Sequence, residues 1–307
     1  DSVDKGAWFV FATEKEENDI RKGVINKIAD LNWSMQGDIS SMDWYIELPS
    51  HQSKLEETYP LAYLLSLSSK LQQQSLLKAP QPNLKNKTNF QYSVIKYLSS
   101  TNQQNPEMNF FKQAHLHPIT LSRQWLQPLI DYSIPPDKAF ETISACKLLE
   151  NCEVKGGRPK TLKNKTVLII PGMYDGAGLG GNGNHKDIFW APLATQFWRN
   201  WESDKVPGGE AHAYMTYHLQ QQRLLIAVPD FVMILVAGLL AKALSLTLLQ
   251  NPNKYKSIIK YLVGINIVYI LISLQIYVSI YLLLPYFLPS TLFWLNLKSS
   301  LRSKSNA

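Results

Sequence analysis

The sequence predicts a layered α/β domain in the first 226 residues, followed by three transmembrane α-helices. Strand-like segments alternate with helix-like segments before residue 227, which is the order that a layered α/β domain requires. Residues 231–297 are almost entirely apolar, and no side chain between Tyr261 and Leu297 is charged. As one helix this uncharged run would be about 55 Å long, nearly twice the roughly 30 Å of bilayer hydrocarbon. We therefore expect two spans folded back on each other, after a first span that precedes them.

The elements of the first part follow from short apolar runs and from helix-start signals. Residues 7–12 (AWFVFA) combine aromatic and β-branched side chains, which is typical of a buried strand. Pro60 stands where a helix begins, and the TVLII run at 166–170 is the clearest central strand. The predicted strands are 7–12, 45–48, 129–132 and 166–170, and the predicted helices are 60–71, 90–98, 137–149, 192–201 and 209–219. We expect the tryptophans of this part to lie in the core or at a domain interface.

The three predicted spans cover residues 231–249, 257–275 and 280–297, within a membrane block at 227–299, and a basic tail follows at 300–307. Seven of the 31 basic residues and none of the 24 acidic ones lie after residue 230. The net charge of +7 therefore belongs to the spans and their connections. A nucleic-acid-binding protein would carry an excess of basic residues on its folded domain, so we expect no nucleic-acid partner.

Two groups of basic residues predict the orientation in the membrane. The first group surrounds the connection between spans one and two, and the second follows span three (Lys254, Lys256 and Lys260; Lys298, Arg302 and Lys304). Three spans bring both groups to one side, and basic residues favour the cytoplasmic side. We therefore expect a multi-pass protein of the inner (plasma) membrane, with residues 1–226 extracytoplasmic and the C-terminus cytoplasmic.

The N-terminal residues and the cysteines complete this outline. The sequence has no start Met, no signal peptide and no N-terminal span, although an exported domain needs one of the last two to cross the membrane. We therefore expect the sequence to be the C-terminal part of a longer protein. Cys146 and Cys152 are six residues apart, and on one continuous helix they would point to different sides, so we expect two unpaired thiols.

A glycine-rich loop after the 166–170 strand is the first candidate binding feature. Gly176, Gly178 and Gly181 fit G-x-G-x-x-G, but the strand ends at Ile170 and no helix start follows, so dinucleotide binding is not indicated. A loop at the end of a central strand borders ligand sites in α/β domains. Carboxylates at strand ends bind polar ligands or cap turns. The candidate ligand-binding residues are Asp175, Gly176, Gly178, Asp187 and Asp131.

Known catalytic and metal-binding patterns are absent from the sequence. Ile170, Pro171 and Gly172 are similar to an oxyanion loop, but the G-x-S-x-G nucleophile turn that acyl transfer requires does not occur. The H-E-x-x-H zinc pattern does not occur either, and His115 and His117 have no third ligand at a suitable spacing. We expect no catalytic residues, no metal and no cofactor.

Residues 206–225 (VPGGEAHAYMTYHLQQQRLL) resemble the "PG-x-E-x-HA … LL … R" segment of the type-two CHASE domain, an extracytoplasmic sensory domain of bacterial receptors. Residues 162–172 (LKNKTVLIIPG) resemble its "LKGK-hydrophobic-G" strand, and residues 187–193 (DIFWAPL) resemble its "D … P-L" stretch. Three closely spaced C-terminal spans are also typical of the family. The resemblance implies a sensory fold without transferable catalytic residues.

Together these observations predict a membrane-anchored sensor module of a bacterial signalling receptor. A small-molecule or envelope signal would pass through the helix at 209–219 into the spans, and then to an output domain absent from this chain. The signal-transmission candidates are Gly209, Glu210, His212, Tyr214 and Pro229. The expected partners are the lipid bilayer, an unknown ligand and a second copy in a homodimer. The alternatives are a membrane-tethered hydrolase that uses the 171–187 loop, and a membrane anchor or interaction domain that senses nothing.

Overall fold

The computed structural model describes residues 7–13, 15–16, 19–20, 31–39, 45–46, 48, 59–73, 80–82, 89–104, 128–143, 162, 165–170, 188–250 and 255–302. The chain forms two compact units. The first unit comprises Asp1–Leu116 and Ile130–Arg223, and the second comprises His117–Leu129 and Leu224–Ala307. The Gly-rich loop, the four ligand candidates within it and both cysteines lie outside the described residues.

A parallel three-stranded sheet forms one part of the first unit. The strands β1 (Val10–Thr13), β4 (Met35–Asp38) and β5 (Tyr59–Pro60) lie in the order β1-β4-β5, with Val10 opposite Met35 and Gly37 opposite Tyr59. Two short strands, β2 (Lys15–Glu16) and β3 (Asp19–Ile20), form an antiparallel pair. The Thr13 hydroxyl donates to the Gly37 carbonyl at 3.1 Å, which adds a side-chain bond to the ladder.

Two helices pack on this sheet and form the main core of the first unit. Helix α2 (Leu61–Gln73) begins directly after Pro60, and Asn89 caps α3 (Phe90–Gln104) by accepting from the Tyr92 amide at 2.9 Å. The core cluster contains Met35, Leu64, Leu67, Leu71 and Val94, all almost fully buried. A Cβ on Gly37 would lie 2.5 Å from the Leu61 Cα, so only glycine allows the first turn of α2 to approach β4 this closely.

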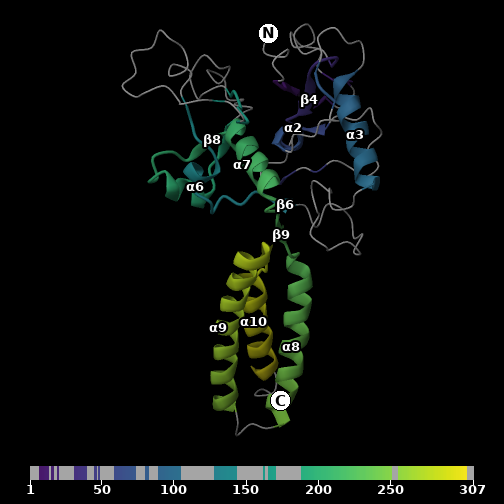
Figure 1. Ribbon diagram of the computed structural model, residues 1–307. Helices are drawn as coiled ribbons and strands as arrows, with labels where there is room; N and C mark the ends of the chain where they lie inside the picture. The colour runs from purple at the N-terminus through teal and green to yellow at the C-terminus, as the bar shows by residue number, and fades with distance from the viewer. Residues whose placement is uncertain are drawn as a thin grey trace. The chain divides into compact units, whose positions relative to one another are not determined.

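The rest of the first unit is organised around helix α7 (Gly208–Gln221), which packs against α2 (Figure 1). A hairpin of β7 (Ile188–Trp190) and β8 (Lys205–Pro207), with α6 (Leu193–Trp198) between them, leads into α7. The short helix α4 (Pro136–Ala139) contacts α7 as well. Helix α7 ends at Gln221, and the next residue, Gln222, adopts a left-handed conformation and donates back to the last turn.

The second unit combines a small sheet with three helices. The strands β6 (Pro128–Leu129), β9 (Leu225–Ala227) and β10 (Leu282–Leu283) lie in the order β10-β9-β6. Figure 1 shows α8 (Asp230–Gln250), α9 (Tyr255–Ile280) and α10 (Phe287–Arg302) side by side. Leu248, Leu262 and Leu297 form a buried cluster near the connection between α8 and α9. The end of α10 therefore lies at the same end of the bundle as that connection.

Among the described residues, two helices and not three are long and apolar enough to cross a membrane, in the ranges Asp230–Leu248 and Ser257–Ile280. The break predicted between the spans at 257–275 and 280–297, a joint at 275–279, is wrong, because α9 continues through it and the Gln275 amide donates to the Ser279 hydroxyl one turn later, at 2.9 Å. The chain turns instead at Tyr281, where φ is 56°, and at the following β10. The helix α10 has 16 residues, fewer than the roughly 20 that usually cross a bilayer.

The mixed α/β character of the first part is confirmed, but four predicted elements differ from the structure. Of the strand predicted at 129–132, only Leu129 is paired, in β6. Residues 166–170 form no strand, and the Ile169 side chain is 93% exposed. The predicted helix at 137–149 ends at Ala139, because Phe140 is extended with φ at −156°. The predicted strand at 45–48 is reduced to an isolated bridge at Tyr45. The helices predicted at 60–71, 90–98, 192–201 and 209–219 correspond to α2, α3, α6 and α7.

Candidate functional site

The candidate site is a group of polar side chains buried around α7. A soluble helix usually buries an apolar stripe, but α7 also buries His212, Tyr214, Thr216 and His218. The His218 side chain is fully buried, and Tyr214 is 1% exposed. Buried polar groups require hydrogen-bond partners, so the contacts of these residues determine the conformation of the segments around the helix.

His218 holds the chain segment that follows β6. The backbone amide of Asp131 donates to the Nε2 atom of His218 at 3.1 Å. The proton of the neutral imidazole is therefore on Nδ1, which has no hydrogen-bond partner among the described residues. Asp131 closes a local turn, because its carboxylate accepts from the Ser133 amide at 3.0 Å and from the Ser133 hydroxyl at 2.6 Å. This is the turn-capping role of an aspartate.

Burial keeps His218 neutral. The loss of hydration lowers the pKa of His218 to about 4, although the nearby Asp131 opposes this shift, and the positive charge of Arg223 adds a smaller lowering. At neutral pH the ring can therefore accept the hydrogen bond from the Asp131 amide. A protonated ring carries a hydrogen on both nitrogens and cannot accept this bond.

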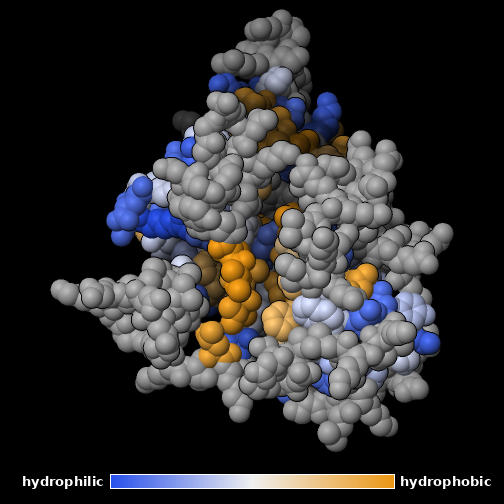
Figure 2. All heavy atoms as spheres, turned by 90° about the horizontal axis from the view of Figure 1, so that it is seen from above, coloured by the Kyte–Doolittle hydropathy of each residue, from blue (hydrophilic) through white to orange (hydrophobic). Residues whose placement is uncertain are grey.

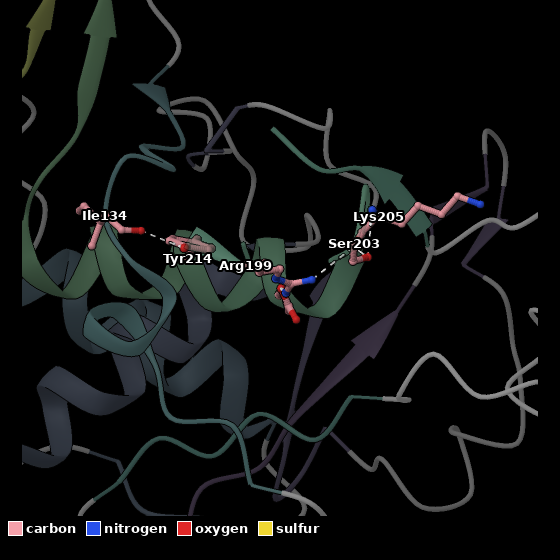
Figure 3. A network of polar contacts seen from close by, with 6 residues as sticks. Ile134, Arg199, Ser203, Lys205 and Tyr214 are labelled. Carbon is pink, nitrogen blue, oxygen red and sulfur yellow. Dashed lines mark hydrogen bonds and ion pairs between the residues drawn. The ribbon is translucent and has the colours of Figure 1, made fainter. Parts of the chain in front are cut away.

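Tyr214 fixes the next part of the same segment. Its hydroxyl donates to the Ile134 carbonyl at 3.0 Å (Figure 3). Tyr132 packs against its ring edge-on at 4.9 Å, and Phe140 does so at 5.4 Å. Burial is the main cause that raises the pKa of Tyr214, and the negative charge of Glu210 adds to it. The phenol thus remains protonated as a donor.

An ion pair anchors the N-terminal end of α7. The guanidinium of Arg199, at the C-terminal cap of α6, contacts the carboxylate of Glu210 in the first turn of α7. Arg199 also donates to the Lys205 carbonyl at 3.3 Å, beside a turn that Ser203 closes (Figure 3). The two charged side chains are only 22% and 16% exposed. Glu210 also lies where the helix dipole favours a negative charge.

Two further contacts connect α7 with other parts of the first unit. Burial lowers the pKa of His212, while the Asp38 carboxylate at the end of β4 and a backbone bond with Ile39 act in the opposite direction. At Gly209, an added Cβ would lie 2.2 Å from the Cγ2 atom of Ile170. Gly209 is therefore required for the close approach between α7 and Ile170, which lies directly before the Gly-rich loop.

The structure brings together part of the predicted site. Asp131, predicted as a ligand contact, and Tyr214, predicted as a transmission residue, lie in one network through His218 and Tyr132. Pro229 belongs to the second unit, where its carbonyl accepts from the Val232 amide at the start of α8. Asp175, Gly176, Gly178 and Asp187 lie outside the described residues.

Sequence reasoning missed two important members, His218 and Arg199. Glu210, Tyr214 and His218 recur every four residues and therefore lie on one face of α7. This spacing was the available signal for His218. No local pattern marks Arg199, because its partner Glu210 is on the next helix and the turn between them has left-handed residues at Asn200 and Trp201.

Exposed aromatic side chains form a second feature of the first unit. Trp190 is 69% exposed, Phe197 57% and Trp201 61%, and Leu193 beside them is 73% exposed. The Lys205 ammonium lies 5.8 Å from the centre of the Trp190 ring. Figure 2, the view from above, shows hydrophobic atoms near its centre and hydrophilic atoms further out. Trp190 and Trp201 are therefore not in the core, and a position at a domain interface stays a prediction for them.

Comparison with known proteins adds no relative. No protein-family model, no curated protein and no solved structure matches the chain. Within the part of the chain that the structure describes, no group of three His, Cys, Asp or Glu residues could hold a metal ion. The chemistry of the site is therefore argued from its contacts alone. These contacts form a protonation-dependent and charge-dependent connection between α7 and the segments around it.

Proposed function

We propose that the chain is a membrane-anchored sensory module of a bacterial signalling receptor. Residues 1–226 form its extracytoplasmic part, and residues 300–307 are a cytoplasmic tail. A ligand or an envelope condition alters the first unit, and the change passes along the chain into the helices of the second. The likeness of residues 206–225 to the type-two CHASE pattern supports this class of function.

Membrane anchoring is supported by α8 and α9, which are apolar over the length of a bilayer. Many of their large apolar side chains are exposed, as expected of surfaces that face lipid. The packing of Leu297 with Leu248 and Leu262 supports a third crossing, in which α10 and the turn before it return the chain to the end that carries the basic residues. That end would be cytoplasmic.

One observation carries the proposal of signal transmission: the two chain segments that join the units are hydrogen-bonded to each other. In the first unit, the Asp131 amide is bound to His218 near the end of α7. In the second unit, Leu129 of β6 is paired with Leu225 of β9. A change at α7 is therefore delivered to two strands that pair with each other, and β9 leads within a few residues into α8.

The test locks this pair of strands. Leu129 and Leu225 face each other in an antiparallel ladder, where opposite Cα atoms are about 4.5 to 5.5 Å apart, which is a distance that a disulfide accepts. The double variant Leu129→Cys/Leu225→Cys is made in a chain whose native cysteines are replaced by serine. Glu210→Gln then perturbs α7, and hydrogen exchange is measured at the start of α8.

We expect Glu210→Gln to accelerate exchange at residues 230–236 in the reduced protein, and the disulfide to abolish this effect. Unchanged exchange in the reduced protein would contradict the coupling. The variant Glu202→Gln removes an exposed carboxylate close to Arg199 in sequence and is the matched control.

A second candidate function, an interaction domain that senses nothing, is favoured by the exposed side chains Trp190, Leu193, Phe197 and Trp201. Exposed apolar patches of this kind are typical of protein–protein contacts, and the partner that we propose is a second copy of the chain. Light scattering of the full chain in detergent tests it. The double variant Trp190→Ser/Trp201→Ser would convert dimer to monomer, and a wild-type monomer would exclude this candidate.

A further inference from the structure

A cavity of about 320 Å³ lies among α8, α9 and α10 of the second unit. Apolar side chains of all three helices line it, among them Met233, Ala237, Leu262 and Phe293. The cavity is open to the outside of the bundle, because several of its lining side chains are exposed, among them Val236, Leu240 and Ile265. Small-molecule sites are apolar cavities of about 300–1,000 Å³ with a few polar groups that orient the ligand. This cavity has the size and the lining of such a site.

The polar groups of the cavity come from α9 and from the start of α10. The Ser290 hydroxyl donates to the Oδ1 atom of Asn266 at 3.0 Å, and the Tyr269 hydroxyl donates to the Pro285 carbonyl at 2.7 Å. The amide nitrogen of Asn266 has no hydrogen-bond partner among the described residues. In this orientation of the amide, its two hydrogens are donors that the protein does not use.

The depth of Asn266 in the membrane span limits which class of ligand can reach its amide. Asn266 lies nine residues from Ser257 and fourteen from Ile280, or roughly 14 Å and 21 Å along the helix. In a bilayer whose hydrocarbon is about 30 Å thick, this donor is deep in the hydrocarbon. Ester groups of the lipids lie at the edges of that layer and do not reach it. An unpaired polar group at this depth is costly, and such groups usually mark a functional site.

We propose that this cavity binds a lipophilic quinone, whose ring carbonyl accepts a hydrogen bond from the Asn266 amide while its isoprenoid chain lies in the bilayer. A quinone is apolar enough to reside in the hydrocarbon and carries a carbonyl on a ring that the cavity can hold. The aromatic ring of Phe293 provides a stacking surface. The inference rests on the membrane insertion of the proposed function, and it adds a second input that enters from within the bilayer.

The experiment uses the full chain in lipid nanodiscs and decylubiquinone as the probe. Trp294, next to Phe293, is the only tryptophan after residue 201, and quinones quench indole fluorescence. We expect saturable quenching that the variant Trp294→Phe removes. Asn266→Leu should weaken binding at least tenfold, because the ring carbonyl loses its donor. Ala237→Phe should also prevent binding, by filling the cavity.

The control variant is Thr291→Val, which removes a hydroxyl from α10 outside the cavity; its binding should equal that of the wild type. Decylbenzene, which has no carbonyl, and methyl decanoate, which has an ester carbonyl, are the matched ligands. Equal binding of decylbenzene, or no effect of Asn266→Leu, would overturn the proposal and leave Asn266 as a contact between helices. Tighter binding of the ester would overturn the quinone assignment. Because the chain is first shown to be integrated in the nanodisc, absence of quinone binding refutes this inference without touching the proposed sensor.

Discussion

Gly209 illustrates how single residues control the site. It lies in the first turn of α7, and the close approach of Ile170 leaves no room for a side chain. At His218, nine residues later, the constraint is protonation rather than size, since its hydrogen bond with the Asp131 amide requires a neutral ring. We therefore expect a methyl group added at Gly209, or a proton added to His218, to disturb the packing around α7.

The variant Gly209→Ala tests the first of these constraints. Its Cβ would overlap Ile170, and overpacking of this kind costs about 1–3 kcal/mol, more than the gain in helix propensity of about 1 kcal/mol. We expect a net decrease in the free energy of unfolding, measured by urea denaturation in detergent with tryptophan fluorescence. Gly238→Ala, whose Cβ would have nothing within 4 Å, is the control and should not destabilise the chain.

The second constraint predicts a pH dependence. The folded-state pKa of His218 is about 4, below the ordinary histidine pKa of 6.5, so protons bind the unfolded state more tightly. The stability that His218 contributes is complete above pH 6.5 and decreases as the pH falls towards 4, by roughly 3 kcal/mol in total. His218→Gln, which keeps an acceptor for the Asp131 amide, should show a shallower decrease between these pH values in urea denaturation. Parallel pH profiles for the two proteins would contradict this assignment.

Helix α7 is an example of an element that could be predicted from the sequence. Its bounds agree with the prediction, because Pro207 and the glycines mark its start. The strand predicted at 166–170 failed, since β-branched residues form a strand only where a neighbouring strand pairs with them, and Ile169 instead faces solvent. The joint placed at 275–279 failed because Gln275 and Ser279 bond to each other within α9; Pro285 was the stronger signal of a break.

The candidate site was predictable only in part, for a related reason. Asp131 and Tyr214 were named separately, but their contact through His218 and Tyr132 joins segments more than 80 residues apart. Such a distant pairing has no local pattern in the chain. Helical spacing could have added His218 to the candidate residues. The turn that directs Arg199 towards Glu210 depends on two left-handed residues, neither of which is a glycine, so the sequence gives no signal of this turn.

The ion pair between α6 and α7 is the prediction at this scale. A double-mutant cycle with Arg199→Met and Glu210→Gln should give a coupling energy of about 1–2 kcal/mol, because both charges are mostly shielded from water. Thermal or urea unfolding of the four proteins provides the energies. A coupling energy near zero would mean that the pair behaves like an exposed surface pair. Glu202→Gln, which removes an exposed charge, should leave stability within about 0.5 kcal/mol.

For the whole molecule, the distribution of charge and hydropathy is the governing feature. All of the net charge lies after residue 230, next to helices that expose large apolar side chains. A chain that ends at Pro229 should therefore be released from membranes by alkaline carbonate, whereas the full chain should remain in the pellet. Release of the full chain would contradict the proposed anchoring.

The number of crossings can be measured separately. In a chain without native cysteines, Lys165→Cys and Ser299→Cys introduce thiols at exposed positions before the spans and after α10. If α10 completes a third crossing, an impermeant maleimide labels position 165 on intact spheroplasts and position 299 only after lysis. Labelling of both positions before lysis would mean that only α8 and α9 cross.

The small sheet of the second unit restricts how its helices can move. The Ile226 amide donates to the Tyr281 carbonyl and the Val228 amide to the Leu283 carbonyl, both at 2.9 Å. The start of α8 is thereby connected to the turn between α9 and α10. Sliding α8 by one helical turn, about 5.4 Å, would break both bonds, and rotating it about its own axis would strain them. Tilting of the three helices as one rigid body retains both bonds, so this is the movement of the helices that the small sheet allows.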